Sequence, residues 1–314
     1  MRARRLIMVG AVAAMVWAAS NGGAAHSSLE PAAGSVTPWL PHPVRFRLEK
    51  ETGLLVRVWL EGSGPYIFAI DTGAGLNVLT ERVAGISRLQ VRTVRPTLVG
   101  GLSAARVSSN REAVIGQLAL GTRDNILPAQ KTALIVPALA PGVDGILDPT
   151  DSYAPLGYSI DITNELIEAV DPVVGRSTRL APGIEAAVVP WLRQDGSNRP
   201  FVKLGDGRIA LLDTGSRFGL AVSEHNAVII TRNRGEANTG GVRDIGGGTI
   251  FSRRVMPTTI SIGELVLRGI PTDVLLKVDT DAPVILGRDA LYPFKITFDP
   301  RRRLIEFVTS AEHK

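Results

Sequence analysis

The feature of this chain that most restricts its fold is an internal repeat in the part that follows residue 43. Residues 68–74 and residues 210–216 are both apolar runs that end in Asp-Thr-Gly followed by a small residue. Three further landmarks follow each run, in the same order and at similar distances from its aspartate. Self-similarity of this kind predicts two structural units built on the same plan.

The landmarks are short, mostly apolar segments. Each of them has the length and composition of a β-strand. The segments that correspond between the two halves are residues 115–120 and 262–267, residues 144–148 and 283–287, and, with a small shift, residues 158–162 and 294–299.

The composition favours strands over helices. Glycine and proline are frequent, at 33 and 20 of 314 residues, and aromatic residues make up only 5%. Many short strands joined by tight turns fit this composition better than a helical bundle. With 45% hydrophobic and 21% charged residues, the chain can bury a substantial core. We therefore expect an all-β chain of two similar lobes, with short helices near residues 149–156 and 289–292.

The first 25 residues have the organisation of a secretory signal peptide. Arginines at positions 2, 4 and 5 precede an apolar run over residues 6–19, and small residues follow it. The run of about 14 residues is shorter than the ~20 that a membrane-spanning helix needs, which favours a removed signal over an uncleaved anchor. We expect a periplasmic or secreted protein, with association with the cell envelope as a related alternative.

The rest of the chain divides at Pro-rich and Gly-rich segments, which resist regular structure. Residues 26–43 carry four prolines and predict a linker, with a propeptide as the alternative. The expected division is a signal peptide at 1–25, a linker at 26–43, a first lobe at 44–170, an inter-lobe linker at 171–195, a second lobe at 196–308 and a tail at 309–314.

Several function classes are disfavoured by what the chain contains. It has no cysteine, which excludes disulfides, thiolate metal sites and thiol nucleophiles. Its four histidines lie far apart in the sequence, so a zinc site of the two-histidine type is not expected. The net charge of +5 comes from scattered arginines without interleaved aromatics, so we expect no binding of nucleic acid.

The two Asp-Thr-Gly turns are the candidate site. Each follows an apolar strand, so Asp71 and Asp213 are delivered at the ends of buried strands. The glycines allow a tight turn and a close approach, and the threonine hydroxyls can support the turns across the interface between the lobes. The supporting residues of these turns are Thr72, Gly73, Thr214, Gly215 and Ser216.

Two carboxyl groups brought together by pseudo-twofold symmetry cannot both ionise easily, so they share one proton. The ionised member takes a proton from a water held between them, the water attacks a carbonyl carbon, and the protonated member donates to the developing oxyanion. Because the two titrations are coupled, the sequence does not assign the acid and the base to Asp71 or Asp213.

The doubled motif resembles the aspartic peptidase family of the retropepsin and pepsin type, in a single-chain form with two Asp-Thr-Gly lobes. The resemblance covers about residues 44–308 and rests on the two motifs and the Ile-Leu elements after them. It implies two pseudo-symmetric, closed-barrel-like β lobes with the active-site cleft between them. It also implies a polypeptide substrate bound in extended form, no metal or organic cofactor, and activity as a single chain.

The resemblance further implies a β-hairpin flap over the cleft. Glycine-rich turns occur at the right interval in both halves, where glycine lets a hairpin bend over a substrate; an ordinary mobile hairpin tip is the alternative. The flap candidates are Gly100 and Gly101 in the first half, and Ile245, Gly246, Gly247 and Gly248 in the second.

Two positions depart from the family pattern. Ala74 lacks the hydroxyl that Ser216 offers, and Asp148 stands where the supporting Ile-Leu element carries glycine. The main alternative to a peptidase is a binding module that holds an extended peptide in the same cleft without cutting it. A glycosidase with two carboxylates is a weaker alternative, because it does not explain why both acids lie in the same repeated tripeptide.

Overall fold

The computed structural model describes residues 40–102, 106–171, 186–194, 196–227, 239–243, 248–278 and 282–310. These residues form mostly β-strands, which confirms the expected β class. The expected signal peptide, most of the Pro-rich linker and the last four residues of the tail lie outside the described residues. Within the described residues, no helix has the length and apolar character needed to cross a membrane.

The first half of the chain forms a nine-stranded sheet. Its hairpin of β3 (Gly53–Leu60) and β4 (Ser63–Ile70) ends directly before Asp71, as expected for an Asp-Thr-Gly turn that follows an apolar strand. Along the sheet the strands are β2 (Arg47–Glu49), β3 (Gly53–Leu60), β4 (Ser63–Ile70), β10 (Gly145–Leu147), β5 (Asn77–Thr80), β9 (Lys131–Val136), β7 (Val107–Ile115) and β6 (Gln90–Val99), with β8 (Leu118–Leu120) paired to β3.

The second half forms a seven-stranded sheet. Its strands are, in spatial order, β14 (Phe201–Lys203), β15 (Ile209–Asp213), β20 (Val284–Gly287), β16 (Leu220–Ser223), β19 (Leu265–Leu276), β18 (Thr249–Ile262) and β17 (Thr239–Arg243).

The two sheets repeat the same topology, which confirms the internal repeat. In the first, β4 pairs in parallel with β10, β10 antiparallel with β5, and β5 in parallel with β9. In the second, β15, β20, β16 and β19 make the same sequence of parallel, antiparallel and parallel pairs. The hairpins β6–β7 and β17–β18 then extend the two sheets in the same way.

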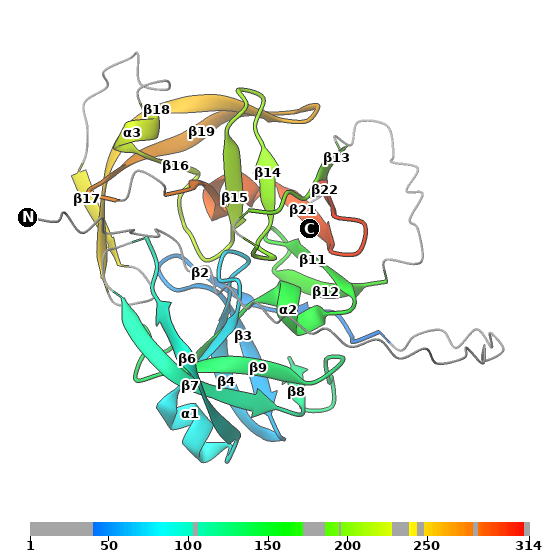
Figure 1. The fold of residues 1–314 in the computed structure, drawn as a ribbon. Helices are drawn as coiled ribbons and strands as arrows, with labels where there is room; N and C mark the ends of the chain where they lie inside the picture. The colour runs from blue at the N-terminus through cyan, green and yellow to red at the C-terminus, as the bar shows by residue number, and fades with distance from the viewer. Residues whose placement is uncertain are drawn as a thin grey trace, which may run out of the picture.

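A third sheet is built equally by both halves and lies between them (Figure 1). Its centre is the antiparallel pair β11–β21, with Ile160 opposite Ile296. The outer strand β13 lies within the segment expected to be an inter-lobe linker, so part of that segment is a strand. The order is β1 (Val44–Arg45), β12 (Leu166–Val170), β11 (Gly157–Asp161), β21 (Phe294–Asp299), β22 (Leu304–Thr309) and β13 (Ala186–Pro190).

The expectation of closed-barrel-like lobes is corrected by the structure. Every sheet has a strand order with two ends, and in the described residues the end strands of a lobe do not pair with each other. The physical reason is that the last hairpin of each half, β11–β12 or β21–β22, joins the shared sheet and does not close its own lobe.

The described residues contain four short helices. Two of them follow β10 and β20 directly, at the places where the sequence predicted helices, and the side chain of Asp148 caps the first by accepting from Thr150 N. The helices are α1 (Glu81–Ile86), α2 (Pro149–Tyr153), α3 (Glu224–Ala227) and α4 (Arg288–Leu291).

One large apolar core runs through both lobes and the shared sheet. In the shared sheet the rings of Tyr158 and Phe298 stack with centroids 4.6 Å apart. The strands behind the two turns are buried on both faces: Leu147 and Leu286 point into the core, while Ile146 and Ile285 belong to smaller clusters on the opposite face. These smaller clusters supply the walls of the site described next.

Candidate active site

The two Asp-Thr-Gly turns lie side by side, each held against the strand behind it. Asp71 N donates to Leu147 O at 2.9 Å, and Asp213 is aligned with Gly287 in the parallel pair β15–β20. Because β4 and β15 are flanked on both sides by other strands, the positions of the two aspartates follow from sheet pairing and do not depend on loop conformation.

Thr72 and Thr214 cross the interface between the halves. Thr72 N donates to Thr214 Oγ1 and Thr214 N donates to Thr72 Oγ1, both at 3.1 Å. Each hydroxyl in turn donates to a carbonyl of the other half, Thr72 to Leu212 O at 2.7 Å and Thr214 to Ile70 O at 3.1 Å. Both threonines are fully buried, so these four bonds fix one turn relative to the other.

Gly73 and Gly215 are glycines because each lies against the aspartate of the other half. A Cβ added at Gly73 would lie 2.7 Å from Asp213 Cγ, and one added at Gly215 would lie 2.5 Å from Asp71 Cγ. Real Cβ atoms do not approach this closely, so only glycine permits the two turns to meet.

Backbone N–H groups hold the carboxyls in place. Gly73 N donates to Asp71 Oδ1 at 2.8 Å, and Ser216 N donates to Asp213 Oδ1 at 3.0 Å. Ser216 therefore supports its aspartate through the backbone, while its hydroxyl accepts from Phe218 N at 3.4 Å. Since a backbone N–H serves this purpose, the absence of a hydroxyl at Ala74 leaves Asp71 supported.

The surroundings of the pair raise the pKa of both carboxyls. Burial raises the pKa of the Asp71 carboxyl well above its ordinary value, and the charge of Asp213 raises it further. Burial also raises the pKa of Asp213, whereas the hydrogen bond with Asp71 and the charge of Arg288 lower it. The arrangement favours one proton shared by the pair.

Two adjoining cavities open on the pair, and Asp71, Asp213, Gly101 and Leu102 line both. One cavity, of about 100 Å³, is walled by apolar side chains that include Leu76, Val78, Ile146 and Ile285. The other, of about 360 Å³, is bounded by the apolar residues Val143, Phe218 and Ile250 and by the charged residues Glu51, Arg217 and Arg288. Together they form a cleft with the carboxyl pair between its two parts.

The hairpin β6–β7 reaches this cleft. Gly100 and Gly101 follow β6; Gly100 lines the smaller cavity and Gly101 lines both. Leu102 packs on an apolar cluster of the second half that contains Phe218 and Ile250. Of the flap candidates in the second half, Gly248 precedes β18 and is not among the lining residues, and residues 245–247 lie outside the described residues.

Arg288 is a site residue that the sequence reasoning missed. Its guanidinium donates to Thr214 O at 2.9 Å and Gly215 O at 3.0 Å, and also to Lys50 O at 3.0 Å, so it connects the second turn to the first half. The available signal was the difference between the two repeats: an apolar run followed by Gly-Arg in the second half, and by Asp-Pro in the first.

Asp148 lies where the repeat places it, in the first half, at the position of Gly287. It is 2% exposed, and its Oδ1 accepts from Thr150 N at 3.0 Å. Asn77 Oδ1 accepts from Asp148 N at 2.9 Å, which attaches the residue to β5. Burial, together with the nearby charge of Asp151, raises the pKa of Asp148 to about 7.

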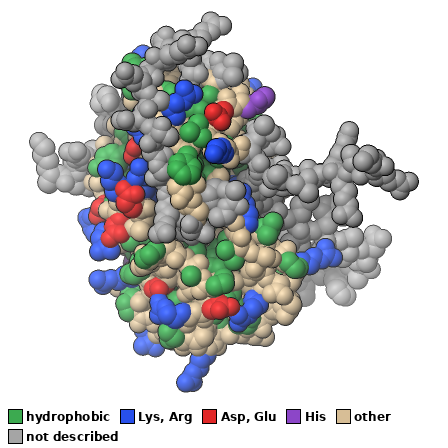
Figure 2. Space-filling model, turned by 90° about the vertical axis from the view of Figure 1, so that its left-hand side faces the viewer, with side chains coloured by type: hydrophobic (Ala, Val, Ile, Leu, Met, Phe, Trp, Pro, Cys, Tyr) green, Lys and Arg blue, Asp and Glu red, His purple; other side chains and the backbone are tan. Residues whose placement is uncertain are grey.

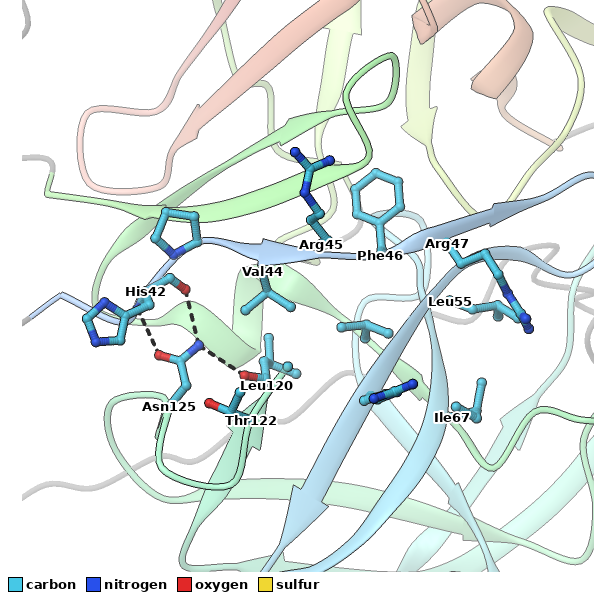
Figure 3. A pocket seen from close by; sticks show the side chains of 14 residues that line it. His42, Val44, Arg45, Phe46, Arg47, Leu55, Ile67, Leu120, Thr122 and Asn125 are labelled. Atoms are coloured by element: carbon cyan, nitrogen blue, oxygen red, sulfur yellow. Dashed lines mark hydrogen bonds between the residues drawn. The ribbon is translucent and has the colours of Figure 1, made fainter. Parts of the chain in front are cut away.

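A larger cavity, of about 630 Å³, lies away from the pair, against β1, β3 and the segment after β8 (Figure 3). Asn125 closes one end of it by accepting from His42 N at 2.8 Å and donating to His42 O and Leu120 O. The described residues that line it include three arginines but neither aspartate nor glutamate, so it lacks an acid pair.

Charges of both signs are interspersed on the molecular face in Figure 2, with Lys and Arg next to Asp and Glu. The first half contains three ion pairs of partly exposed side chains, namely Arg92 with Glu112, Arg111 with Glu81, and Arg82 with Asp144. In the part of the chain that the structure describes, no three His, Asp or Glu side chains are grouped so as to hold a metal ion.

No family model matches this sequence, and no curated protein is found to be related to it.

Proposed function

We propose that this protein is an aspartic endopeptidase with the two-lobed acid-protease architecture, in which Asp71 and Asp213 together activate a water molecule. The observation that carries the proposal is the meeting of two carboxyls, each in an Asp-Thr-Gly turn and each resting against the glycine of the other turn. Crossed threonine hydrogen bonds hold this arrangement at the centre of a cleft.

The chemistry follows from one proton shared by two carboxyls. The ionised carboxylate takes a proton from water, and the water oxygen bonds to the carbonyl carbon of the substrate. The protonated carboxyl gives its proton to the carbonyl oxygen, which yields a neutral tetrahedral intermediate. When this collapses, the ionised carboxylate takes a proton from one hydroxyl of the intermediate as the new C=O bond forms. The C–N bond breaks, the protonated carboxyl gives its proton to the nitrogen, and the pair again holds one shared proton.

An extended polypeptide is the substrate that fits the cleft. The pair lies between two cavities, so a chain that crosses it can place side chains on both sides of the bond to be cut. The walls of both cavities are largely apolar, which favours apolar side chains next to that bond. The hairpin tip with Gly100 and Gly101 is positioned to cover the chain, and this supports its role as a flap.

The proposal is tested by cleavage of an unstructured protein such as denatured casein. The purified chain without residues 1–25 is assayed from acidic to neutral pH beside Asp71→Asn and Asp213→Asn, each checked for folding by circular dichroism. Asp206→Asn is the matched control, because Asp206 is an exposed acid of the same half as Asp213 and pairs with Arg208.

We expect the wild type and the control to cut and both dyad variants to lose at least about 10³-fold in kcat/KM. If all four folded proteins are equally inactive but bind extended peptides, the peptidase proposal is wrong, and the chain is a peptide-binding module of the same architecture.

A further inference from the structure

The two halves differ in charge at the positions directly behind the catalytic turns. In the parallel pair β4–β10, Leu147 is opposite Ile70, so that Asp148 follows next to Asp71. In the equivalent pair β15–β20, Gly287 is opposite Asp213, and Arg288 comes next. A buried acid therefore lies next to one turn, and a buried base is hydrogen-bonded to the other.

The charge behind Asp213 is positive and held rigidly. Arg288 is 5% exposed and donates to the carbonyls of Thr214 and Gly215, the two residues that follow Asp213. The charged groups that face Arg288 are Asp71, Asp213, Asp289 and Arg217. Arg217 is itself paired with Glu51 at 2.8 Å, whereas Arg288 is hydrogen-bonded directly to the second turn. In a protein interior such a cation stabilises a carboxylate.

The ionisable group behind Asp71 is an acid, Asp148, and hydrogen bonds also hold it in place. Asp148 is fixed by its cap on α2 and by Asn77, whose Nδ2 donates to Asp151 Oδ2 at 2.6 Å. The ammonium of Lys131 donates to the carbonyls of Asp151 and Ala154 and not to Asp148. The titratable groups around Asp148 are Asp71, which follows β4, Asp151 on α2 and Tyr158 on β11. Lys131 on β9 and Glu112 on β7 face Asp151.

Building on the proposed function, we propose that Asp148 and Arg288 are positioning residues that set the direction of proton transfer, with Asp71 as the protonated acid and Asp213 as the ionised base. The carboxyl of Asp148 next to Asp71 disfavours the ionised form of Asp71, because two negative charges would then lie close together. The guanidinium of Arg288 stabilises the ionised form of Asp213. Asp213 then takes the proton from water, and Asp71 gives its proton to the carbonyl oxygen of the substrate.

This arrangement extends the working range toward neutral pH. The pair is active while it holds one proton, and it loses activity at alkaline pH when that proton leaves. Because the pKa of Asp148 is raised to about 7, its charge appears in the neutral range, where it opposes loss of the proton from Asp71. Removing that charge should let the proton leave at lower pH.

The test is an NMR titration of carboxyl ¹³C-labelled aspartates, which does not depend on activity, combined with the pH profile of kcat/KM. Wild type, Asp148→Asn and the matched charge control Asp206→Asn are compared, and Asp71→Asn and Asp213→Asn assign the signals. The amide of Asp148→Asn keeps an oxygen to cap α2; Asp148→Ser, which also caps helices, replaces it if the first variant does not fold.

We expect Asp148→Asn to lower the pKa of the shared proton and the alkaline limb of the pH profile together, by about 0.5 to 1 pH unit, with no shift in Asp206→Asn. We also expect the remaining aspartate to differ between the two single variants. The pKa of Asp213, measured in Asp71→Asn, should be lower than the pKa of Asp71, measured in Asp213→Asn. An unchanged shared pKa in Asp148→Asn, or the reverse order of the two single aspartates, overturns the inference. If the protein cleaves but the titration of Asp148→Asn is unchanged, the peptidase proposal stands and this inference is wrong. If the titration shifts as expected but no protein cleaves, the charge asymmetry stands and the peptidase proposal is wrong.

Discussion

At the scale of single residues, the tightest steric constraint on the carboxyl pair is at Gly215, where there is no room for a side chain. A methyl group there would lie 2.5 Å from Asp71 Cγ, and the carboxyl could avoid it only by leaving its partner. We expect Gly215→Ala to lower kcat/KM by at least about 100-fold, because small displacements of catalytic groups are costly. Steady-state kinetics on a protein with wild-type circular dichroism would show this.

Gly85→Ala is the matched control for that substitution. Gly85 lies in α1, a Cβ added there meets nothing within 4 Å, and its φ is not positive. Alanine in a helix is favoured over glycine by about 0.5 to 1 kcal/mol, so this variant should be slightly more stable and fully active. Equal losses of activity in both variants would mean that the close approach of Gly215 to Asp71 does not account for the loss.

At the scale of elements, the approach of β11 to its neighbours depends on Gly157. A Cβ there would lie 2.6 Å from Phe298 O and 3.5 Å from Val170 O, both of them backbone atoms of adjacent strands. We expect Gly157→Ala to lower the free energy of unfolding by about 1 to 3 kcal/mol, because neither strand can move without breaking its pairing. Urea denaturation beside Gly85→Ala measures this, and a midpoint equal to that of the wild type would contradict it.

Local pattern predicted the elements that carry the site but not the pairings that join them. The strands before the two aspartates, the helices after β10 and β20, and the matching segments of the two halves each show in a short stretch of residues, so the sequence was sufficient to predict them. The shared sheet depends on contacts between residues more than 100 positions apart, such as Ile160 with Ile296, and β13 shows no turn or period that links it to β22. The sequence likewise does not show that Arg288 folds back onto the carbonyls of its own half.

At the scale of the whole molecule, buried acids make stability depend on pH. A carboxyl whose pKa is raised in the folded state binds more protons folded than unfolded, so stability is greatest at low pH and falls as pH rises toward the folded pKa. For Asp148 this interval runs from about 4 to about 7. Asp148→Asn should therefore be more stable than the wild type at pH 8, on the order of 1 to 3 kcal/mol, with a smaller gain at pH 4. Urea midpoints at both pH values test this, and a gain that does not change with pH would refute it.

The shared sheet also makes this chain equivalent to a twofold dimer whose subunits are covalently joined. In a true homodimer the two halves of such a site meet only above a certain concentration, and symmetry forces both to carry the same side chains. Here the two halves belong to one chain, so their association is intramolecular and does not depend on the protein concentration. The carboxyl pair therefore stays assembled at any dilution. The two halves are also free to diverge, and the replacement of Gly287 and Arg288 by Asp148 and Pro149 in the first half is a difference that no symmetric pair could hold.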